Sequence, residues 1–441
     1  MAEPCPGGRW PRRADVLRVI AGRGTARACI ALSAVVLLPA WGAERFGEYV
    51  AATAPFAVLL FVAMGAEKTI LTSVPRTRRL AHQSTRALLA RAAAPVAVAA
   101  LAAAALAPVG GQPAMYGLGA VYLSGQGLLS ALASTHRMNG HPVRDTAAFG
   151  ALALHVVAAT GLAVVGVFEP YAYLLVLVGG VATACAVLAA LLPALRTRPA
   201  RARAGLGHSL TRRAALAAVT DVADSASISV LYVLLAALVV PEDVAMVYLA
   251  LLASATLGGL VVLLLRIAQP ATSLRLRGTA GRSGRATART ISGIAVAVTT
   301  SAVLAVATTA LIAWTNGGPP AVHSLGANLV ALAAVTLVEM TAFAAIVYAV
   351  YLLENTTGAA LRTTGSAAAA GLVATAAAAV VAIPVLGAVG AMTALVVGLA
   401  AKATWLRTHL SRTPPPPTQR DAPLPTVRWG GVVSVGEKNR R

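Results

Sequence analysis

The stretch RTRPARARAGLGHSLTRR (residues 196–213) divides the chain into two halves of similar design. It carries six arginines and no acidic residue, and six long apolar runs lie on each side of it. Most of these runs approach or exceed the roughly 20 residues that an α-helix needs to cross a bilayer. The sequence therefore predicts an all-α, polytopic membrane protein of about 12 transmembrane helices, with two six-helix lobes joined by a basic linker.

The composition agrees with a protein dissolved in lipid. Apolar residues form 58% of the 441 residues, charged residues form 12%, and the mean hydropathy is +0.76. Soluble proteins average about 45–50% apolar and about 25% charged residues. The twelve candidate spans are residues 26–43, 50–74, 87–109, 114–135, 146–168, 170–194, 212–240, 244–268, 290–314, 324–353, 364–385 and 388–408.

The positive charges indicate how these spans are oriented. Of 36 Lys and Arg residues, all but Arg45 and Lys68 lie at the termini or in every second gap between spans. The remaining gaps carry acidic residues, namely Glu44, Glu48, Glu169, Glu242 and Asp243. The positive-inside rule then predicts a multi-pass protein of the plasma membrane with both termini in the cytoplasm. The net charge of +21 fits anionic lipid headgroups better than nucleic acid, so we expect no nucleic-acid partner.

The predicted organisation has five parts. They are a basic cytoplasmic segment (1–25), an N-terminal six-helix lobe (26–195), a basic linker (196–211), a C-terminal six-helix lobe (212–410) and a disordered, Pro-rich cytoplasmic tail (411–441). The second helix of each lobe starts alike, with Gly47-Glu48-Tyr49-Val50 in one and Pro241-Glu242-Asp243-Val244 in the other. Two parallel repeats of six helices are typical of transporters that carry their substrate along the interface of the repeats.

Few ionisable side chains lie inside the spans, and these are the candidates for function. Each costs about 2.5–3.5 kcal/mol on insertion scales, so it usually has a role. Asp221 and Asp224 share a helix face with Ser225 nearby. Two neighbouring carboxylates repel, which favours binding of H⁺ or Na⁺ and coupling of that ion to transport. The alternative places both in a wet vestibule or in contact with a neighbouring helix.

Glu67 and Lys68 are adjacent, so their side chains diverge by about 100° on a helix. In a functional reading, Lys68 faces a substrate phosphate and Glu67 is its counter-charge or part of an ion site. In the other reading, Lys68 extends to the inner membrane surface. Arg266 and the loop arginines either orient the protein or bind a diphosphate headgroup with paired hydrogen bonds.

The tenth span carries a polar stripe. Asn328, Thr336 and Glu339 recur at helical spacing, which suggests either a transport or coupling role or a protonated Glu bonded between helices. His155, alone in the fifth span, is more typical of a structural histidine.

The chain shows no motif of catalysis. It contains no GxxxxGK[ST], GxSxG or HExxH, and its three cysteines form no metal-ligand spacing. We therefore expect no enzyme, no metal and no cofactor beyond coupled H⁺ or Na⁺. The high Ala, Val and Arg content with little Lys is typical of a GC-rich, actinobacterial genome.

Three stretches carry a resemblance to a known family. They are Phe46-Gly47-Glu48-Tyr49 with Gly65 and Arg76 behind it, Tyr248 through Pro270-Ala271-Thr272-Ser273, and Ile383-Pro384-Val385-Leu386-Gly387-Ala388-Val389-Gly390-Ala391-Met392-Thr393. Over roughly residues 15–410 the chain resembles the multidrug/oligosaccharidyl-lipid/polysaccharide exporter superfamily, and within it the polysaccharide flippases. Asp221 matches an Asp that these flippases often carry. The first helix lacks the Asp of multidrug antiporters.

The resemblance implies a V-shaped transporter with a polar central cavity that opens alternately to each side. It implies a flippase of lipid-linked oligosaccharide or polysaccharide precursors, as in lipopolysaccharide or exopolysaccharide export. The implied partners are the lipid-linked sugar, membrane lipids and polysaccharide-assembly proteins. Three alternatives stay open: an H⁺- or Na⁺-coupled exporter of small molecules, a carrier of the major facilitator type, and a membrane protein without transport.

Overall fold

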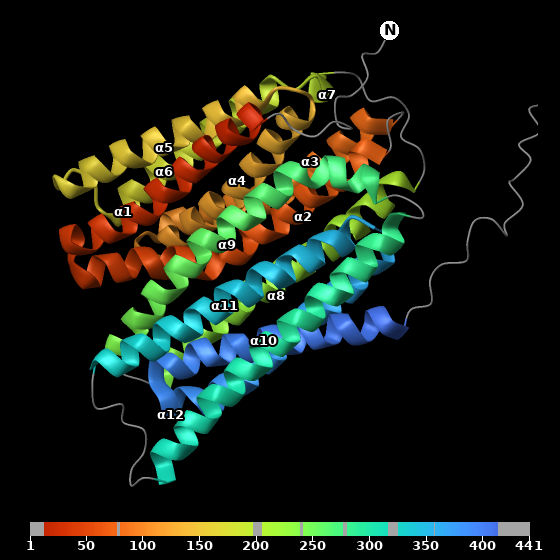
Figure 1. Ribbon diagram of the computed structural model, residues 1–441. Coiled ribbons are helices and arrows are strands. Elements are labelled where there is room, and N and C mark those ends of the chain that lie inside the picture. Colours follow the sequence, from red (N-terminus) through yellow and green to blue (C-terminus); the bar gives the residue numbers. More distant parts are fainter. Residues whose placement is uncertain are drawn as a thin grey trace, which may run out of the picture.

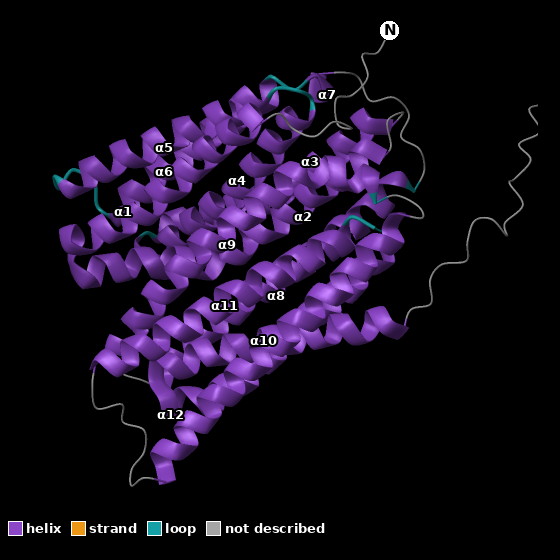
Figure 2. Cartoon of the chain, viewed as in Figure 1, coloured by secondary structure: helices purple, strands orange, loops and turns teal. Residues whose placement is uncertain are grey.

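A computed structural model describes residues 13–76, 80–196, 205–238, 241–276, 280–315, 325–356 and 358–412. Within these residues the regular structure is entirely helical (Figure 2). The N-terminal lobe consists of α1 (Arg13–Thr53), η2 (Ala54–Phe56), α2 (Ala57–Ser73), η3 (Val74–Arg76), α3 (Ala81–Leu106), η5 (Ala107–Val109), α4 (Gly111–Met138), α5 (Pro142–Val164), α6 (Pro170–Ala190) and α7 (Pro193–Arg196). The C-terminal lobe consists of α8 (Leu206–Leu238), α9 (Pro241–Arg275), α10 (Gly281–Thr315), α11 (Leu325–Glu354) and α12 (Gly358–Arg412).

Two glycines turn long helices back on themselves. Gly42 in α1 has φ 75° and Gly387 in α12 has φ 53°, which is the left-handed region that glycine enters without steric cost. Within the described residues, ten segments are long and apolar enough to cross a membrane. That number treats Ala359–Ser411 as one segment although it bends at Gly387, and it omits α4. With these two added, the helices follow the twelve predicted spans in order.

Helix α4 differs from the others because it lies at the centre of its lobe. It packs against α1, α2, α3, α5 and α6. Its glycines permit this closeness: a Cβ at Gly127 would lie 2.5 Å from the Cβ of Ala63, and one at Gly119 would collide with the carbonyl of Ala52. Small residues allow membrane helices to approach closely, as here. A helix surrounded by protein needs less apolar surface than one surrounded by lipid.

The two lobes meet at one end of the molecule and spread apart at the other (Figure 1). We call the converging end the basic end, because η3 ends there at Arg76, α9 ends there at Arg275, and α10 begins there with Arg282 and Arg285 close to its start. The main contact joins α2 of one lobe to α8 of the other. Gly65 makes this contact possible, because a Cβ there would lie 2.5 Å from the carbonyl oxygen of Ala214 and 2.6 Å from the Cβ of Ala218. The arrangement confirms the V shape.

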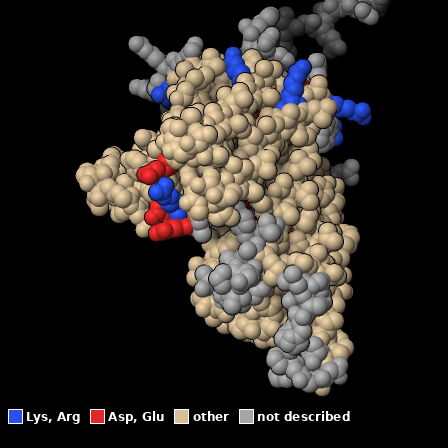
Figure 3. All heavy atoms as spheres, turned by 90° about the vertical axis from the view of Figure 1, so that its left-hand side faces the viewer, with Lys and Arg blue, Asp and Glu red and all other residues tan. Residues whose placement is uncertain are grey.

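The opposite end of the molecule faces the viewer in Figure 3, where uncharged residues form most of the visible surface. The exposed pair of Arg45 and Glu169 lies at this end, with 3.8 Å between the charged atoms. The positive-inside rule predicts that an end with few positive charges is the outer side.

Some boundaries differ from those predicted. The first helix begins at Arg13, inside the predicted basic segment 1–25, because Val16, Val19 and Ile20 form an apolar stripe that packs on Leu263 and Ile267 of the other lobe. Helix α8 begins at Leu206 rather than at residue 212. Residues 197–204 of the predicted linker and residues 413–441 of the predicted Pro-rich tail lie outside the described part of the chain.

Candidate functional site at the lobe interface

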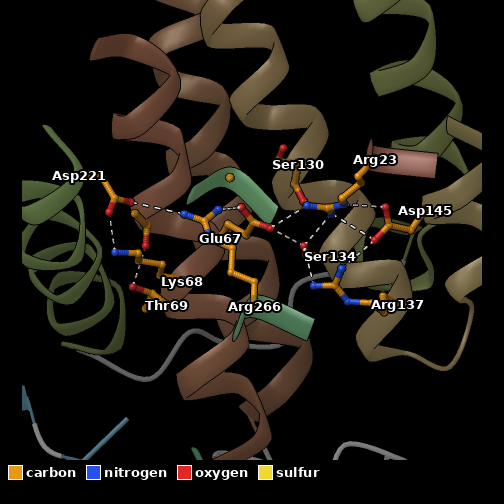
Figure 4. A network of polar contacts seen from close by, with 12 residues as sticks. Arg23, Glu67, Lys68, Thr69, Ser130, Ser134, Arg137, Asp145, Asp221 and Arg266 are labelled. Carbon is orange, nitrogen blue, oxygen red and sulfur yellow. Dashed lines mark hydrogen bonds and ion pairs between the residues drawn. The ribbon is translucent and has the colours of Figure 1, made fainter. Parts of the chain in front are cut away.

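A network of buried charges joins the two lobes near the basic end (Figure 4). Its centre is Glu67 on α2, whose side chain has no exposed surface. One carboxylate oxygen of Glu67 accepts hydrogen bonds from Arg23, at 3.4 Å, and from the hydroxyl of Ser134. The other oxygen lies 2.6 Å from Nη1 of Arg266, on α9 of the opposite lobe. Glu67 is therefore shared by both lobes.

The N-terminal side of the network is held by Asp145 at the start of α5. Arg23 on α1 donates two hydrogen bonds to its carboxylate, at 2.9 and 3.1 Å. Arg137 near the end of α4 donates a third at 3.0 Å. The paired geometry of Arg23 and Asp145 is the strong form of such contacts. The guanidinium of Arg23 also stacks 4.7 Å above the ring of Phe149.

The C-terminal side is reached through Lys68. Its ammonium lies 2.8 Å from Asp221 on α8 and 3.2 Å from Glu354 at the end of α11. Asp221 also lies 3.4 Å from Nη2 of Arg266. Two adjacent residues of α2 therefore form ion pairs with the other lobe. Glu67 binds the cation Arg266, and Lys68 binds the carboxylates of Asp221 and Glu354. Glu67 is not the counter-charge of Lys68, because the two side chains diverge.

Arg76 in η3 adds a contact between the lobes at the basic end in which the acceptors are backbone carbonyls. Its guanidinium donates to the carbonyl of Ser273 in α9, at 2.7 and 3.0 Å, and to those of Asn355 and Thr356 after α11. The last carbonyls of a helix are partly negative and lack partners within the helix, so a cation stabilises them. Arg76 therefore fastens α2 to the ends of two helices of the other lobe.

Arg27 lines the same interface without a carboxylate partner among the described ion pairs. Its Nη1 lies 2.7 Å from the carbonyl oxygen of Gly259 in α9. The cations Arg23, Arg27, Lys68, Arg137 and Arg266 face the carboxylates Glu67, Asp145, Asp221 and Glu354. The described residues of the interface therefore carry more positive than negative charge. Arg213 on α8, within electrostatic range of Glu354, increases the excess.

The second acidic residue of α8 lies apart from this network. Both carboxylate oxygens of Asp224 are 2.7 Å from the ammonium of Lys402 in α12, inside the C-terminal lobe. Asp221 and Asp224 do not form a pair, since each has its own lysine. Ser225 follows on the same helix, partly buried.

The polar stripe of the tenth span is in α11. Glu339 is 5% exposed, and its carboxylate accepts a hydrogen bond of 2.6 Å from Ser254 in α9. None of the ion pairs among the described residues includes Glu339. Thr336 bonds the carbonyl of Leu332. The side chain of Asn328 lies outside the described part of the structure.

His155 makes a structural contact. Its Nε2 lies 2.7 Å from the carbonyl oxygen of Val176, and the ring packs against Gly180 of α6. It therefore joins α5 to α6 within one lobe.

Sequence reasoning misses several members of the network. The charge pattern marks Arg23 and Arg137 only as topology determinants, and Lys402 only as part of a basic end. Asp145 and Glu354 lie near the predicted ends of spans, where a charged residue is expected to meet water. One signal points to them: the chain has only 15 acidic residues, so each one within or beside a span is noteworthy.

No protein-family model matches this chain, and neither does any curated protein sequence. Solved structures do match. One is a MOP superfamily transporter from Pyrococcus furiosus, with a TM-score of 0.60 and 12% identity over 93% of this chain and 98% of that one. Another is a MATE transporter from Vibrio cholerae, with a TM-score of 0.64 and 12% identity over 90% of this chain and 95% of that one. A third is an outward-facing multidrug resistance MATE family transporter, with a TM-score of 0.61 and 11% identity over 93% and 98%.

This likeness confirms the predicted fold. Over more than nine-tenths of its length the chain has the architecture of MATE transporters of the MOP superfamily, the superfamily that the sequence motifs resemble.

Proposed function

We propose that this protein is a membrane transporter that moves a lipid-linked, anionic oligosaccharide or polysaccharide precursor from the inner to the outer leaflet by alternating access. The observation that carries the proposal is that the described residues of the lobe interface include more cations than carboxylates. The surplus consists of Arg27, which is exposed and donates to a backbone carbonyl, and Arg213, which is partly buried and belongs to none of the described ion pairs. Charges in a membrane interior are expensive, so an unbalanced set favours a ligand of opposite sign. Arginine in particular suits the paired oxygens of phosphate.

The fold supports the alternating-access part of this proposal. The lobes are joined at the basic end and spread at the other, which is one of the two states that such a transporter needs (Figure 1). If the basic end is cytoplasmic, the described state is open toward the outside. Polysaccharide-assembly proteins and membrane lipids would then be the partners, and the site of action would be the plasma membrane.

The direct test is transport in proteoliposomes. Purified protein is reconstituted with fluorescent lipid-linked sugars that carry a diphosphate, with and without a proton gradient. We expect the protein to increase the rate at which the labelled headgroup crosses to the opposite leaflet. Matched neutral glycolipids are expected to stay in place. Equal rates for charged and neutral lipids, or rates equal to those of empty liposomes, would contradict the proposal.

A second function is favoured by one observation, the isolated Glu339. A buried carboxylate with a hydroxyl partner and no cation in the described ion pairs has the chemistry to bind H⁺ or Na⁺. It supports an ion-coupled exporter of small molecules. One of the structural neighbours is itself a multidrug resistance transporter.

Glu339→Gln tests this second function. The amide keeps an acceptor for Ser254 but cannot titrate, so export driven by an H⁺ or Na⁺ gradient should fall to the rate without a gradient. Dye efflux from proteoliposomes measures this, and Thr341→Val, at an exposed position on the same helix, is the control. Unchanged gradient dependence in Glu339→Gln would remove Glu339 from the coupling site.

A further inference from the structure

The buried charges of the interface differ in which lobe supplies their partners. Asp145 is bound by Arg23 and Arg137 of its own lobe. Glu67 keeps Arg23 and Ser134 of its own lobe in addition to Arg266. If the lobes separated at the basic end, these carboxylates would therefore remain paired.

The same holds for the charges of the C-terminal lobe. Asp221 lies 3.4 Å from Arg266, and both belong to that lobe. Glu354 has Arg213 of the same lobe within electrostatic range. Separation would leave each of these side chains with an opposite charge nearby.

Among the described residues that form ion pairs at this interface, Lys68 is the exception. It is 8% exposed, and both carboxylates that it contacts, Asp221 and Glu354, belong to the other lobe. Its neighbour Glu67 points to the other side of α2 (Figure 4). Separation of the lobes would thus leave an ammonium on the face of the N-terminal lobe without a carboxylate. Arg27, whose acceptor is the carbonyl of Gly259 across the interface, would be released on the same face.

We infer that Lys68 is an exchange point: it binds Asp221 and Glu354 while the basic end is closed, and the phosphate group of the substrate when the lobes part there. This inference rests on the proposed function and assigns its loading step to one residue. Opening of the basic end breaks both contacts of the ammonium with Asp221 and Glu354, so opening without an anion is disfavoured. An anion that replaces the two carboxylates compensates for these lost contacts. Asp221 then keeps its ion pair with Arg266, and Glu354 stays within the electrostatic range of Arg213. Anion binding and opening of the basic end are then coupled.

The test measures the distance between the lobes. Spin labels are placed at His82 on α3 and Ser283 on α10, two exposed positions at the basic end, in a background without native cysteine. The full chain is studied in lipid nanodiscs by pulsed electron–electron double resonance, which measures the distance between the two labels. In one arm inorganic pyrophosphate is added, and in the other the discs contain a polyprenyl diphosphate. We expect at least one of the two anions to increase the population with separated labels several-fold.

Three variants separate an exchange role from a purely structural one. In Lys68→Gln the basic end should open without any anion, and added anion should have no further effect. In Lys68→Arg the response should persist. In the double variant Lys68→Asp with Asp221→Lys, a pair between the lobes is restored and closure should return. The cation then stays beside Glu354 of its own lobe on opening, so the anion response should still be absent.

The exposed pair of Arg45 and Glu169 provides the control. In the double variant Arg45→Glu with Glu169→Arg, the population with separated labels should match that of the wild type, both without anion and with added anion. An anion response in the Lys68/Asp221 double variant equal to that of the wild type would overturn the inference, and so would a response retained in Lys68→Gln.

Failure of the inference is distinguishable from failure of the proposed function. If lipid-linked sugars cross the bilayer but the Lys68/Asp221 double variant transports them as fast as the wild type, the proposed transport function is supported and the exchange role of Lys68 is contradicted. If only free pyrophosphate opens the basic end through Lys68, the exchange stands and the substrate is a free anion. If only the polyprenyl diphosphate does so, both proposals are supported.

Discussion

At the residue scale, the interface is built from oppositely charged side chains that pair with one another and are largely shielded from solvent. Arg23 shows this most clearly. It is 4% exposed and contacts Asp145, Glu67 and Ser134, which come from three different helices. Replacing one member of a buried pair leaves the other member charged and without a partner, which costs about 3–5 kcal/mol.

Arg23→Met should therefore lower the stability of the N-terminal lobe by about 3–5 kcal/mol. Asp145 keeps its ion pair with Arg137 in this variant, so we expect the loss of stability to lie near the lower limit of this range. The measurement is thermal or denaturant unfolding of the purified protein in detergent. Arg18→Met is the matched control on the same helix, since the side chain of Arg18 is 56% exposed and its change should stay within about 0.5 kcal/mol. Equal losses in the two variants would contradict the buried network.

The residue scale also shows which site predictions can be made from the sequence. Asp221, Glu67 and Lys68 stand out as charges inside spans, and the structure brings all three into one network. Their partners do not stand out in the same way. Arg23 lies within a run of topology arginines, and nothing in the local pattern distinguishes a guanidinium at the membrane surface from one turned into the protein.

At the scale of elements, glycines decide how closely helices approach. The predicted span 114–135 is found as α4, yet its place at the centre of the lobe comes from Gly119 and Gly127 facing α1 and α2. Its lower apolar content is typical of a helix shielded from lipid. Hydropathy by itself does not name the neighbours that do the shielding.

Gly119→Ala should destabilise the lobe by about 1–3 kcal/mol, because the new methyl group would meet the backbone of Ala52 and force the helices apart. Gly150→Ala is the same chemical change at a helical position where no atom lies within 4 Å. It should be neutral or stabilise by up to about 1 kcal/mol through helix propensity. Unfolding in detergent distinguishes the two, and a neutral Gly119→Ala would show that α1 and α4 are not in contact there.

At the scale of the whole molecule, positive charge is distributed unevenly between the two ends of the protein. At the end where the lobes converge, η3 and α9 end at Arg76 and Arg275, whereas uncharged residues form most of the visible surface of the opposite end (Figures 1 and 3). The positive-inside rule then predicts that the basic end and both termini are cytoplasmic.

Cysteine labelling in intact cells tests this orientation. With the native cysteines replaced, Glu169→Cys at the opposite end should react with a membrane-impermeant maleimide added outside. Asn139→Cys at the turn between α4 and α5 should react only after the membrane is permeabilised. Both positions are exposed in the structure. The reverse pattern would invert the topology and, with it, the direction of the proposed transport.

The sequence by itself determined the number and order of the helices and the division into two lobes, and it predicts their orientation. These follow from local quantities, the length of apolar runs and the side on which arginine falls, which each segment carries independently of the others. The tertiary structure alone decided that Lys68 meets Asp221 and Glu354, that Glu67 meets Arg23 and Arg266, and that Asp224 is bound by Lys402. Such pairings depend on the rotation of each helix about its axis and on which helices are in contact. Lipid solvates all apolar helix faces equally well, so the bilayer does not determine either of these.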